Sequence, residues 1–312
     1  MTEESIINNN FFMQGFYFDT LIEINIWCCE SKGDDILKKS FDLCKYYEEL
    51  LSKTKKGSDI YNINTSGING YCVNKETLNI IEKSLYYSEL SNGGFDISIQ
   101  PLLKLWNFKC EEKIIPTEED IEANLELVNY KNIVINGNNV MLKREGMSID
   151  LGGIAKGYIA NKLKEFLISQ GVNSGIINLG GNVLCIGKKE NGEKFKIGIQ
   201  EPFSSRGEIL GILEICDKSV VSSGIYERFF EKDDKIYHHI INPKDGKPFE
   251  SDLLQVTILS EDSMDGDALS TIALSLGEKE GMKLIDSIEG VEGLFINKDG
   301  VIKGTKNFES ML

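Results

Sequence analysis

Apolar and polar residues alternate between residues 21 and 27, and this period-two pattern predicts a half-buried β-strand. Residues 34–53 instead repeat their apolar positions at helical spacing and predict an amphipathic helix. A second helix is expected to begin near Asn74 and to end at Asn92-Gly93-Gly94, because glycine readily adopts the backbone conformation that ends a helix. The first third of the chain therefore combines one strand with two helices.

The middle of the chain contains capping and turn signals. Thr117, followed three positions later by Asp120, predicts the start of a helix. Residues 132–143 predict a β-hairpin, since a glycine and an asparagine lie at its centre. A short strand is expected over residues 148–151, and it leads through two glycines into a helix that ends at Gly171.

The second half of the chain is richer in strands. Further strands are expected over residues 175–179, 194–200, 208–215, 219–221 and 254–259. Two helices, over residues 265–276 and 279–288, and a hairpin turn at residues 298–300 complete the chain. Strands and helices are mixed without a regular β-α alternation, so the predicted fold class is α+β rather than a doubly wound sheet.

The sequence shows no sign of a boundary between domains. The 312 residues contain no internal repeat, low-complexity tract or proline-rich linker, which favours one continuous domain over residues 1–312. Two closely packed lobes with the functional site between them are the alternative. Residues 1–17 are expected to form an N-terminal extension without fixed structure.

Composition narrows the choice of partner and compartment. The formal net charge of −15 argues against a nucleic-acid partner, because phosphate backbones need a basic face. No stretch is long and apolar enough to span a bilayer, and the polar, acidic start lacks the features of a signal peptide. We therefore expect a cytoplasmic protein with no membrane span, unless a leader was removed.

The seven cysteines are scattered, odd in number and contain no C-x-x-C pair. They give poor support for a disulfide framework or a zinc site and favour a reducing compartment. They are Cys28, Cys29, Cys44, Cys72, Cys110, Cys185 and Cys216.

A glycine-rich turn is the most informative local feature. Asp150 ends the expected short strand, Gly152 and Gly153 follow, and Lys156 lies in the first turn of the next helix. Glycines allow close approach of the backbone, a helix N-terminus offers free N–H groups to an anion, and a lysine adds positive charge. This arrangement suits a phosphate or diphosphate. An ordinary tight strand-to-helix turn, with aspartate as a cap, is the alternative.

An acidic helix start lies near residue 265. Asp267 and Thr271 are four residues apart, so both face the same side of a helix, where a carboxylate and a hydroxyl can share a hard cation. Helix capping by Ser263 or Asp265 is the alternative, and it needs no metal.

The chain has two histidines, and they are adjacent. In an extended segment, neighbours point to opposite faces, so His238 and His239 cannot easily serve one site together. A proton carrier in catalysis is one interpretation, because histidine titrates near neutral pH. A structural hydrogen bond or a surface position is the other.

The order of these motifs resembles that of the ApbE family, the FAD:protein FMN transferases. The matching stretches extend from about Phe18 to Thr271 and occur in the same order as in the family. They are Phe18-Asp19-Thr20, Ser58-Asp59-Ile60-Tyr61-Asn62-Ile63-Asn64, Gly93-Gly94-Phe95-Asp96 with Leu105-Trp106 beyond it, the turn at Asp150, Leu179-Gly180-Gly181-Asn182, Ser222-Ser223-Gly224, His239-Ile240-Ile241-Asn242-Pro243 and the acidic helix start.

The resemblance implies a role for individual residues. The FAD-binding residues it implies are Phe18, Thr54, Gly94, Phe95, Asp96, Asp150, Lys156, Ser222, Ser223, Gly224 and Ile241, with Ile241 acting through its backbone. The implied Mg²⁺ ligands are the Gly153 carbonyl, the Asp267 and Thr271 side chains and the Ser270 carbonyl. His239 and Asp267 are the implied catalytic residues.

Several positions depart from the common family pattern. Phe18 stands where methionine is frequent, and Ser222 stands where threonine is usual, which keeps the hydroxyl. Asn242 replaces a frequent aspartate, so that charge is absent. Thr54 falls where some relatives place a tyrosine on the flavin, so a stacking contact is missing.

The implied activity is Mg²⁺-dependent transfer of FMN from FAD to a serine or threonine of an acceptor flavoprotein, with release of AMP. Hydrolysis of FAD to FMN and AMP is an alternative at the same site, and a non-catalytic FAD-binding protein is a second. The partners expected are the acceptor and FAD but no nucleic acid, and the protein is expected to be a monomer or a homodimer.

Overall fold

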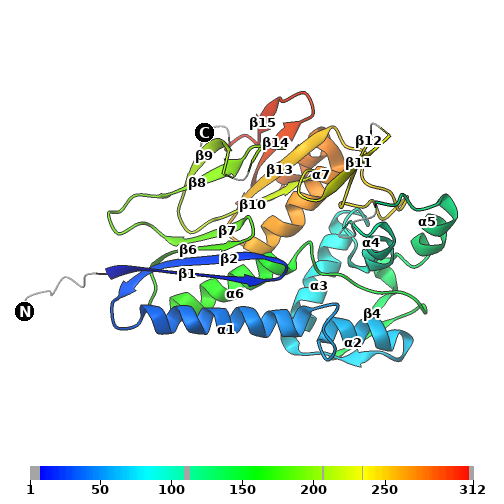
Figure 1. Ribbon diagram of the computed structural model, residues 1–312, viewed down its shortest axis with the longest axis horizontal. Helices are drawn as coiled ribbons and strands as arrows, with labels where there is room; N and C mark the ends of the chain where they lie inside the picture. Colours follow the sequence, from blue (N-terminus) through cyan, green and yellow to red (C-terminus); the bar gives the residue numbers. More distant parts are fainter. Residues whose placement is uncertain (1–7, 109–112, 206, 234, 309–312) are drawn as a thin grey trace, which may run out of the picture.

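A computed structural model describes residues 8–108, 113–205, 207–233 and 235–308. Within these ranges, eight strands form one sheet in which every neighbouring pair is antiparallel (Figure 1). Their order across the sheet is β1 (Asn8–Tyr17), β2 (Thr20–Cys29), β6 (Ser174–Leu179), β7 (Asn182–Gly187), β10 (Ser219–Gly224), β13 (Leu253–Ser260), β14 (Glu292–Asn297) and β15 (Ile302–Gly304).

The first hairpin corrects the expectation of an N-terminal extension without fixed structure. β1 pairs with β2 along its whole length, and the turn residues Phe18 and Asp19 have φ of 54° and 60°. Two consecutive residues with positive φ fit the twist of a tight hairpin. The expectation is therefore wrong for Asn8–Tyr17, whereas residues 1–7 lie outside the described ranges.

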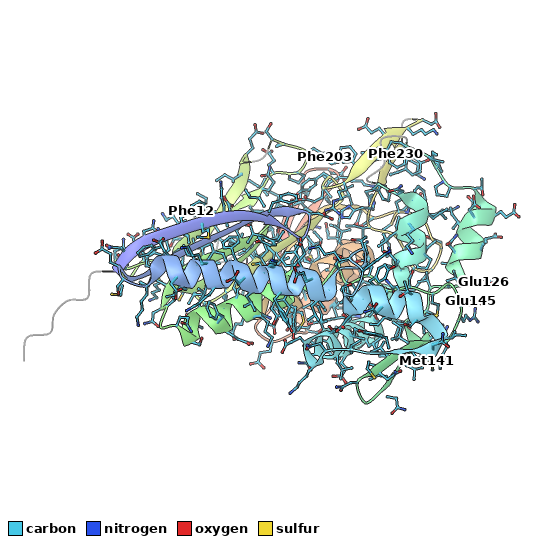
Figure 2. The ribbon with its side chains drawn as sticks, turned by 60° about the horizontal axis from the view of Figure 1, so that its bottom comes forward. Phe12, Glu126, Met141, Glu145, Phe203 and Phe230 are labelled. Carbon is cyan, nitrogen blue, oxygen red and sulfur yellow. The ribbon has the colours of Figure 1, made fainter. Side chains whose placement is uncertain are left out.

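Three helices cover one face of the sheet: α1 (Gly33–Leu51), α6 (Ala155–Ser169) and α7 (Ser263–Asp286) (Figure 1). Alternate residues of β2, such as Ile24, are fully buried under them, because successive side chains of a strand point to opposite faces. The ring of Phe11 packs against Gly33, so the next residue, Phe12, points away from α1 and is 55% exposed (Figure 2).

The other face of the sheet is covered by a two-stranded ribbon made of β8 (Phe195–Gln200) and β9 (Ile209–Ile215). Phe195 and Leu213 of this ribbon are buried against the sheet together with Phe308. The helices and the ribbon thus enclose separate apolar clusters on opposite sides of one sheet, which is the layered packing expected of an α+β domain.

A mixed group of elements packs beside one end of the sheet (Figure 1). It comprises α2 (Asp59–Ser66), η1 (Gly67–Asn69), β3 (Tyr71–Cys72), α3 (Lys75–Leu90), η2 (Ile97–Ile99), α4 (Gln100–Trp106), α5 (Glu118–Leu125), η3 (Tyr130–Asn132), β4 (Ile133–Asn136) and β5 (Asn139–Leu142). The hairpin of β11 (Phe229–Lys232) and β12 (Lys235–His238) joins this group, since Phe230 packs with Trp106 of α4. The chain therefore forms a single domain.

The predicted helix ends are largely confirmed. Asn74 caps α3 by accepting a hydrogen bond from the Glu76 N–H at 2.9 Å, and Thr117 caps α5 by accepting one from the Asp120 N–H at 3.2 Å. The cap of α7 is Asp262, and not Ser263 or Asp265, which the alternative interpretation of the acidic helix start named.

The two C-terminal helices that the sequence predicts are joined at a sharp break. Gly277, within the span of α7, has φ 76° and ψ 174°, which is not a helical conformation. Positive φ is accessible to glycine at little steric cost, so the chain can change direction there. The segments before and after Gly277 correspond to the two predicted helices.

The predicted strand over residues 148–151 is wrong. The backbone of Ile149 bonds to the side chain of Asn64, which accepts from the Ile149 N–H at 2.6 Å and donates to the Ile149 carbonyl at 3.0 Å. The Asp150 N–H donates to the Ile97 carbonyl at 2.8 Å. An asparagine amide thus takes the place of a neighbouring strand, and the segment is not part of a sheet.

Two further expectations concern cysteines and membranes. The six cysteines among the described residues are free, and Cys110 lies outside those ranges. In the part of the chain that the structure describes, no helix combines the length and apolar character needed to cross a bilayer.

Candidate functional site

The glycine-rich turn and the acidic helix start meet directly. The N–H of Gly157, in the first turn of α6, donates to Asp267 Oδ2 at 2.6 Å, across 110 residues of sequence. Asp267 is 6% exposed. Two segments that the sequence analysis selected independently therefore form one site.

Glycine is required at position 157 because α6 and α7 touch there. A Cβ on Gly157 would lie 2.2 Å from the carbonyl oxygen of Ser263 and 2.5 Å from the Cα of Met264, both backbone atoms. Backbone atoms cannot move aside as a side chain can. The absence of a side chain thus brings the N–H of Gly157 within reach of Asp267.

The carbonyl of Gly153 has no donor in the structure. Gly157 is the third residue of α6, so its N–H has no partner within the helix and donates to Asp267 instead. No group among the described residues donates to the Gly153 carbonyl. A carbonyl without a donor, four residues before the glycine that bonds to a buried carboxylate, is the kind of group that a cation or an ordered water satisfies.

The Asp267 carboxylate is held by neutral donors on both oxygens. Asn182 Nδ2 donates to Oδ1 at 3.0 Å, while Gly157 donates to Oδ2. Burial raises the pKa of Asp267, and the opposing influences are the positive charge of Lys156 and these two hydrogen bonds. Each carboxylate oxygen keeps a second lone pair for another partner.

Hydroxyl groups from two elements gather beside Asp267. Ser223 Oγ of β10 lies 2.8 Å from Ser270 Oγ and 3.2 Å from Thr271 Oγ1 of α7. Thr271 Oγ1 also lies 3.5 Å from the Asp267 carbonyl oxygen, one helical turn away. Ser223, predicted from the sequence as an FAD-binding residue, is therefore adjacent to the predicted metal ligands.

These groups fit a hard cation such as Mg²⁺. The Asp267 carboxylate, the Thr271 hydroxyl and the free Gly153 carbonyl supply only oxygen atoms, which Mg²⁺ and Ca²⁺ prefer. Within the described ranges no three histidine, cysteine, aspartate or glutamate side chains cluster as a metal site. A cation here would therefore need further oxygens from a ligand or water. Ser270 is fully buried within α7, and the metal-binding role of its carbonyl stays a prediction.

Asp150 is held from two sides in the glycine turn. Its Oδ1 accepts a hydrogen bond from the Gly152 N–H at 2.6 Å, and its Oδ2 forms an ion pair with Lys53. Lys53 Nζ also lies 3.1 Å from Gln100 Oε1. The carboxylate thus fixes the shape of the turn and carries a lysine that the sequence analysis did not select.

The predicted flavin-binding segment packs against the same turn. The ring of Phe95 lies against Gly153, where a Cβ would approach it to 3.0 Å, and Gly94 lies near Ser275 of α7. The Asp96 carboxylate accepts from the Ser98 N–H at 2.8 Å and the Tyr130 N–H at 2.8 Å. Asp96 is therefore engaged in shaping the loop, and its contact with FAD stays a prediction.

His239 is half-buried and its ring has a defined orientation. Nδ1 lies 3.2 Å from the Arg228 carbonyl oxygen, which also accepts the His239 N–H at 3.0 Å. A carbonyl can only accept, so Nδ1 carries the proton and Nε2 keeps its lone pair. Burial, followed by the nearby charge of Arg228, lowers the pKa of His239 to about 4, and Lys156 contributes in the same direction.

His238 points elsewhere, as its position in an extended segment predicts. It is 4% exposed, and its Nε2 lies 3.0 Å from the Phe249 carbonyl oxygen. Burial lowers the pKa of His238 as well. Of the two histidines, His239 is therefore the one placed within the electrostatic reach of Lys156.

Other predicted residues form hydrogen bonds with groups other than Asp267 and the hydroxyl groups beside it. Ser222 Oγ bonds to Thr257 Oγ1 at 2.8 Å, on the opposite face of β10 from its neighbour Ser223. Phe18 lies in the β1–β2 turn, where its N–H donates to Glu48. Thr54 is exposed and bonds to Ser52. Their roles in FAD binding remain predictions.

Gly224 and Ile241 are fixed by close packing. A Cβ on Gly224 would lie 2.4 Å from the ring of Tyr226, so the ring covers the backbone there. The side chain of Ile241 is buried with Trp106, while its backbone bridges to Pro248. This leaves the backbone of Ile241, rather than its side chain, as the part that the predicted FAD contact would use.

A separate cavity of about 320 Å³ lies near the C-terminal end of α6. Its lining includes Trp27, Lys32 and Gln170. Gln170 follows the last residue of α6, whereas Gly157 lies in its first turn, so this cavity is not part of the site.

Comparisons with known proteins give one consistent family. The sequence profile described as "ApbE family" matches residues 18–295. A FAD:protein FMN transferase of Klebsiella pneumoniae is 35% identical over 272 residues, covering 86% of this chain and 84% of that protein. A FAD:protein FMN transferase of Treponema pallidum is 30% identical over 285 residues, covering 86% and 79%.

Solved structures give the same result for the fold. The crystal structure of the ApbE protein from Thermotoga maritima matches with a TM-score of 0.90 at 29% identity, covering 97% of this chain and 99% of that one. The flavin transferase ApbE from Vibrio cholerae matches with a TM-score of 0.87 at 24% identity, which supports the fold alone. The chain belongs to the ApbE family.

Proposed function

We propose that this protein transfers the FMN half of FAD to a serine or threonine hydroxyl of an acceptor flavoprotein, with Mg²⁺ bound beside the diphosphate. The family relationship and the names of the relatives support the transferase activity. The observation that carries the proposal is the bond between Gly157 and Asp267, because it joins the helix start that carries Lys156 to a buried carboxylate.

The FAD diphosphate would lie at the start of α6, where Lys156 adds positive charge. Asp267, Thr271 and the Gly153 carbonyl would hold the cation, and the diphosphate oxygens would complete its coordination. When bound, Mg²⁺ would stabilise negative charge on the phosphoryl oxygens and on the leaving phosphate.

The reaction is a phosphoryl transfer. The acceptor oxygen forms a bond to the phosphorus on the FMN side, the bond from that phosphorus to the bridging oxygen breaks, and AMP leaves with the bridging oxygen. The proton of the acceptor hydroxyl has to be removed as the new bond forms. His239 is suited to accept it through Nε2, because Nδ1 is engaged with the Arg228 carbonyl and Nε2 keeps its lone pair.

The test uses a candidate acceptor protein incubated with the enzyme, FAD and Mg²⁺. Mass spectrometry of the acceptor should show the added mass of FMN on one hydroxyl residue, and AMP should appear in equal amount. If AMP is released in the absence of acceptor, and the acceptor stays unmodified when it is present, the protein is instead an FAD hydrolase. Absence of AMP under both conditions would identify a binding protein.

A further inference from the structure

Asn182 occupies a buried position directly behind Asp267. It is the first residue of β7, follows the turn Gly180-Gly181 and is 1% exposed. Its amide nitrogen lies 3.0 Å from Asp267 Oδ1. A fully buried amide beside a buried carboxylate has few alternative partners, so the orientation of one fixes the other.

The direction of this hydrogen bond is determined by the carboxylate. An ionised carboxylate can only accept, so Asn182 must present its NH₂ group to Asp267. The amide oxygen then faces Ser263 Oγ at 2.7 Å, and Ser263 must donate to it. Ser263 Oγ in turn lies 2.9 Å from Ser219 Oγ. Ser263 and Ser219 are both fully buried.

These three residues form a chain of hydrogen bonds that ends on Asp267. It connects the start of β10, through the first turn of α7, to the first residue of β7. Gly157 holds the other carboxylate oxygen, so both oxygens are fixed and the carboxylate cannot rotate without breaking a buried hydrogen bond. Breaking one inside a protein leaves an unsatisfied polar group and is costly.

Both donors to Asp267 are neutral, and this matters for a cation. A lysine or arginine bonded at the same position would cancel the negative charge that attracts the metal. An amide orients the carboxylate while leaving its charge and one lone pair on each oxygen available. Groups that orient a metal ligand in this way commonly change metal affinity by about 10–100-fold when they are removed.

We propose that Asn182, held by Ser263, is a positioning residue that keeps the Asp267 carboxylate in its metal-binding orientation. The inference rests on the proposed metal-binding role of Asp267. It assigns to the Leu179-Gly180-Gly181-Asn182 segment a part in metal binding, since Asn182 acts through Asp267.

The test measures metal binding directly, with Mn²⁺ as the probe. Binding of Mn²⁺ to the full-length protein with saturating FAD and no acceptor is followed by the loss of the electron paramagnetic resonance signal of free Mn²⁺. Asn182→Leu keeps the approximate size and removes the donor. We expect its Mn²⁺ dissociation constant to rise about 10–100-fold, and activity at saturating metal to recover most of the wild-type kcat.

Two further variants complete the test. Ser263→Ala is a milder change that serves if Asn182→Leu does not fold. It removes only the hydroxyl that fixes the amide, and we expect a smaller rise of the Mn²⁺ dissociation constant in the same direction. Asn178→Ala changes a second asparagine of the same hairpin, which bonds to Glu23 and the Gly181 N–H rather than to Asp267, and should leave Mn²⁺ binding unchanged.

The outcomes separate this inference from the proposed function. Wild-type Mn²⁺ affinity in a folded Asn182→Leu variant overturns the positioning role, and so does wild-type affinity in Ser263→Ala if Asn182→Leu does not fold. Asp267→Asn is measured in parallel. If Asp267→Asn also binds Mn²⁺ with wild-type affinity, the metal site itself is wrongly placed. If Asp267→Asn loses Mn²⁺ binding while Asn182→Leu keeps it, only the role of Asn182 is overturned.

Discussion

The Gly157 N–H lies 2.6 Å from Asp267 Oδ2, and this one contact joins the helix that begins at the glycine turn to the helix that carries the acidic residues. Gly157 is the third residue of α6, so its N–H has no partner within the helix and is available to the carboxylate. The same contact therefore places the start of α6 beside the buried carboxylate of the candidate metal site.

Asp267→Ala should reduce FMN transfer by about 100-fold or more, because the site loses its only charged metal ligand. The measurement is AMP release in the presence of an acceptor, with thermal unfolding to check the fold. Asp265→Asn is the matched control, since Asp265 lies on the same helix but pairs with Lys83 of α3. Full activity of Asp267→Ala in buffer containing a metal chelator would contradict the assignment.

His239→Ala should slow transfer by about 100-fold or more while leaving FAD affinity nearly unchanged, because a base acts on the acceptor hydroxyl. The two quantities are measured separately, as single-turnover AMP release and as FAD binding by fluorescence. The matched control is His238→Ala, which removes a buried ring bonded to Phe249 and should affect stability more than transfer. A His239→Ala variant with weakened FAD binding but normal turnover of bound FAD would point to a substrate-binding role.

Acidification should destabilise the protein through His239. Its pKa is about 4 in the folded chain and 6.5 for the unperturbed side chain, so the unfolded chain binds the proton more tightly between these values. Stability therefore falls as the pH is lowered from 6.5 to 4, by about 3 kcal/mol from this group. In urea unfolding, the free energy of unfolding of His239→Gln should fall less than that of the wild type over this pH range. An equal fall in both proteins would mean that burial does not lower the pKa of His239.

Lys53→Met should weaken FAD binding about fivefold, because Asp150 loses the cation that helps to fix the glycine turn, and a partly exposed ion pair contributes about 1 kcal/mol or less. FAD titration followed by fluorescence measures the effect. Lys55→Met is the control, as Lys55 pairs with Glu48 instead. Tighter FAD binding in Lys53→Met would show that the ion pair opposes the ligand.

Gly157→Ala should lower stability by about 1–3 kcal/mol or more, since the added Cβ would lie 2.2 Å from a backbone oxygen of α7 and would force the two helices apart. The free energy of unfolding is measured in urea. Gly137→Ala provides the comparison for backbone strain alone, because φ is positive there, unlike at Gly157, and nothing lies within 4 Å. Unchanged stability of Gly157→Ala would show that the two helices do not touch at this position.

The local part of this site was accessible from the sequence. Glycines before a helix and a carboxylate one turn from a hydroxyl have direct chemical meaning, so the sequence itself points to the glycine turn and to the pair Asp267 and Thr271. The role of Gly153 as a metal ligand is implied by the resemblance to the family. The helices around residues 34–53 and 265–288 were predicted because their apolar spacing and glycine break reflect burial directly.

The long-range partners were not accessible in the same way. Lys53 lies 97 residues from Asp150, and Asn182 lies 85 residues from Asp267, so no local pattern connects either pair. The strand expected over residues 148–151 failed for a related reason, because the Asn64 side chain supplies the hydrogen bonds that a neighbouring strand would.

The separation of 110 residues between Gly157 and Asp267 also has a consequence for synthesis of the protein. A ribosome must produce most of the chain before the two can meet, so a polypeptide released early contains the glycine turn without its carboxylate. Such fragments should be unable to consume FAD. Contacts between distant parts of a chain also slow folding, so activity should appear only after the C-terminal helix has docked.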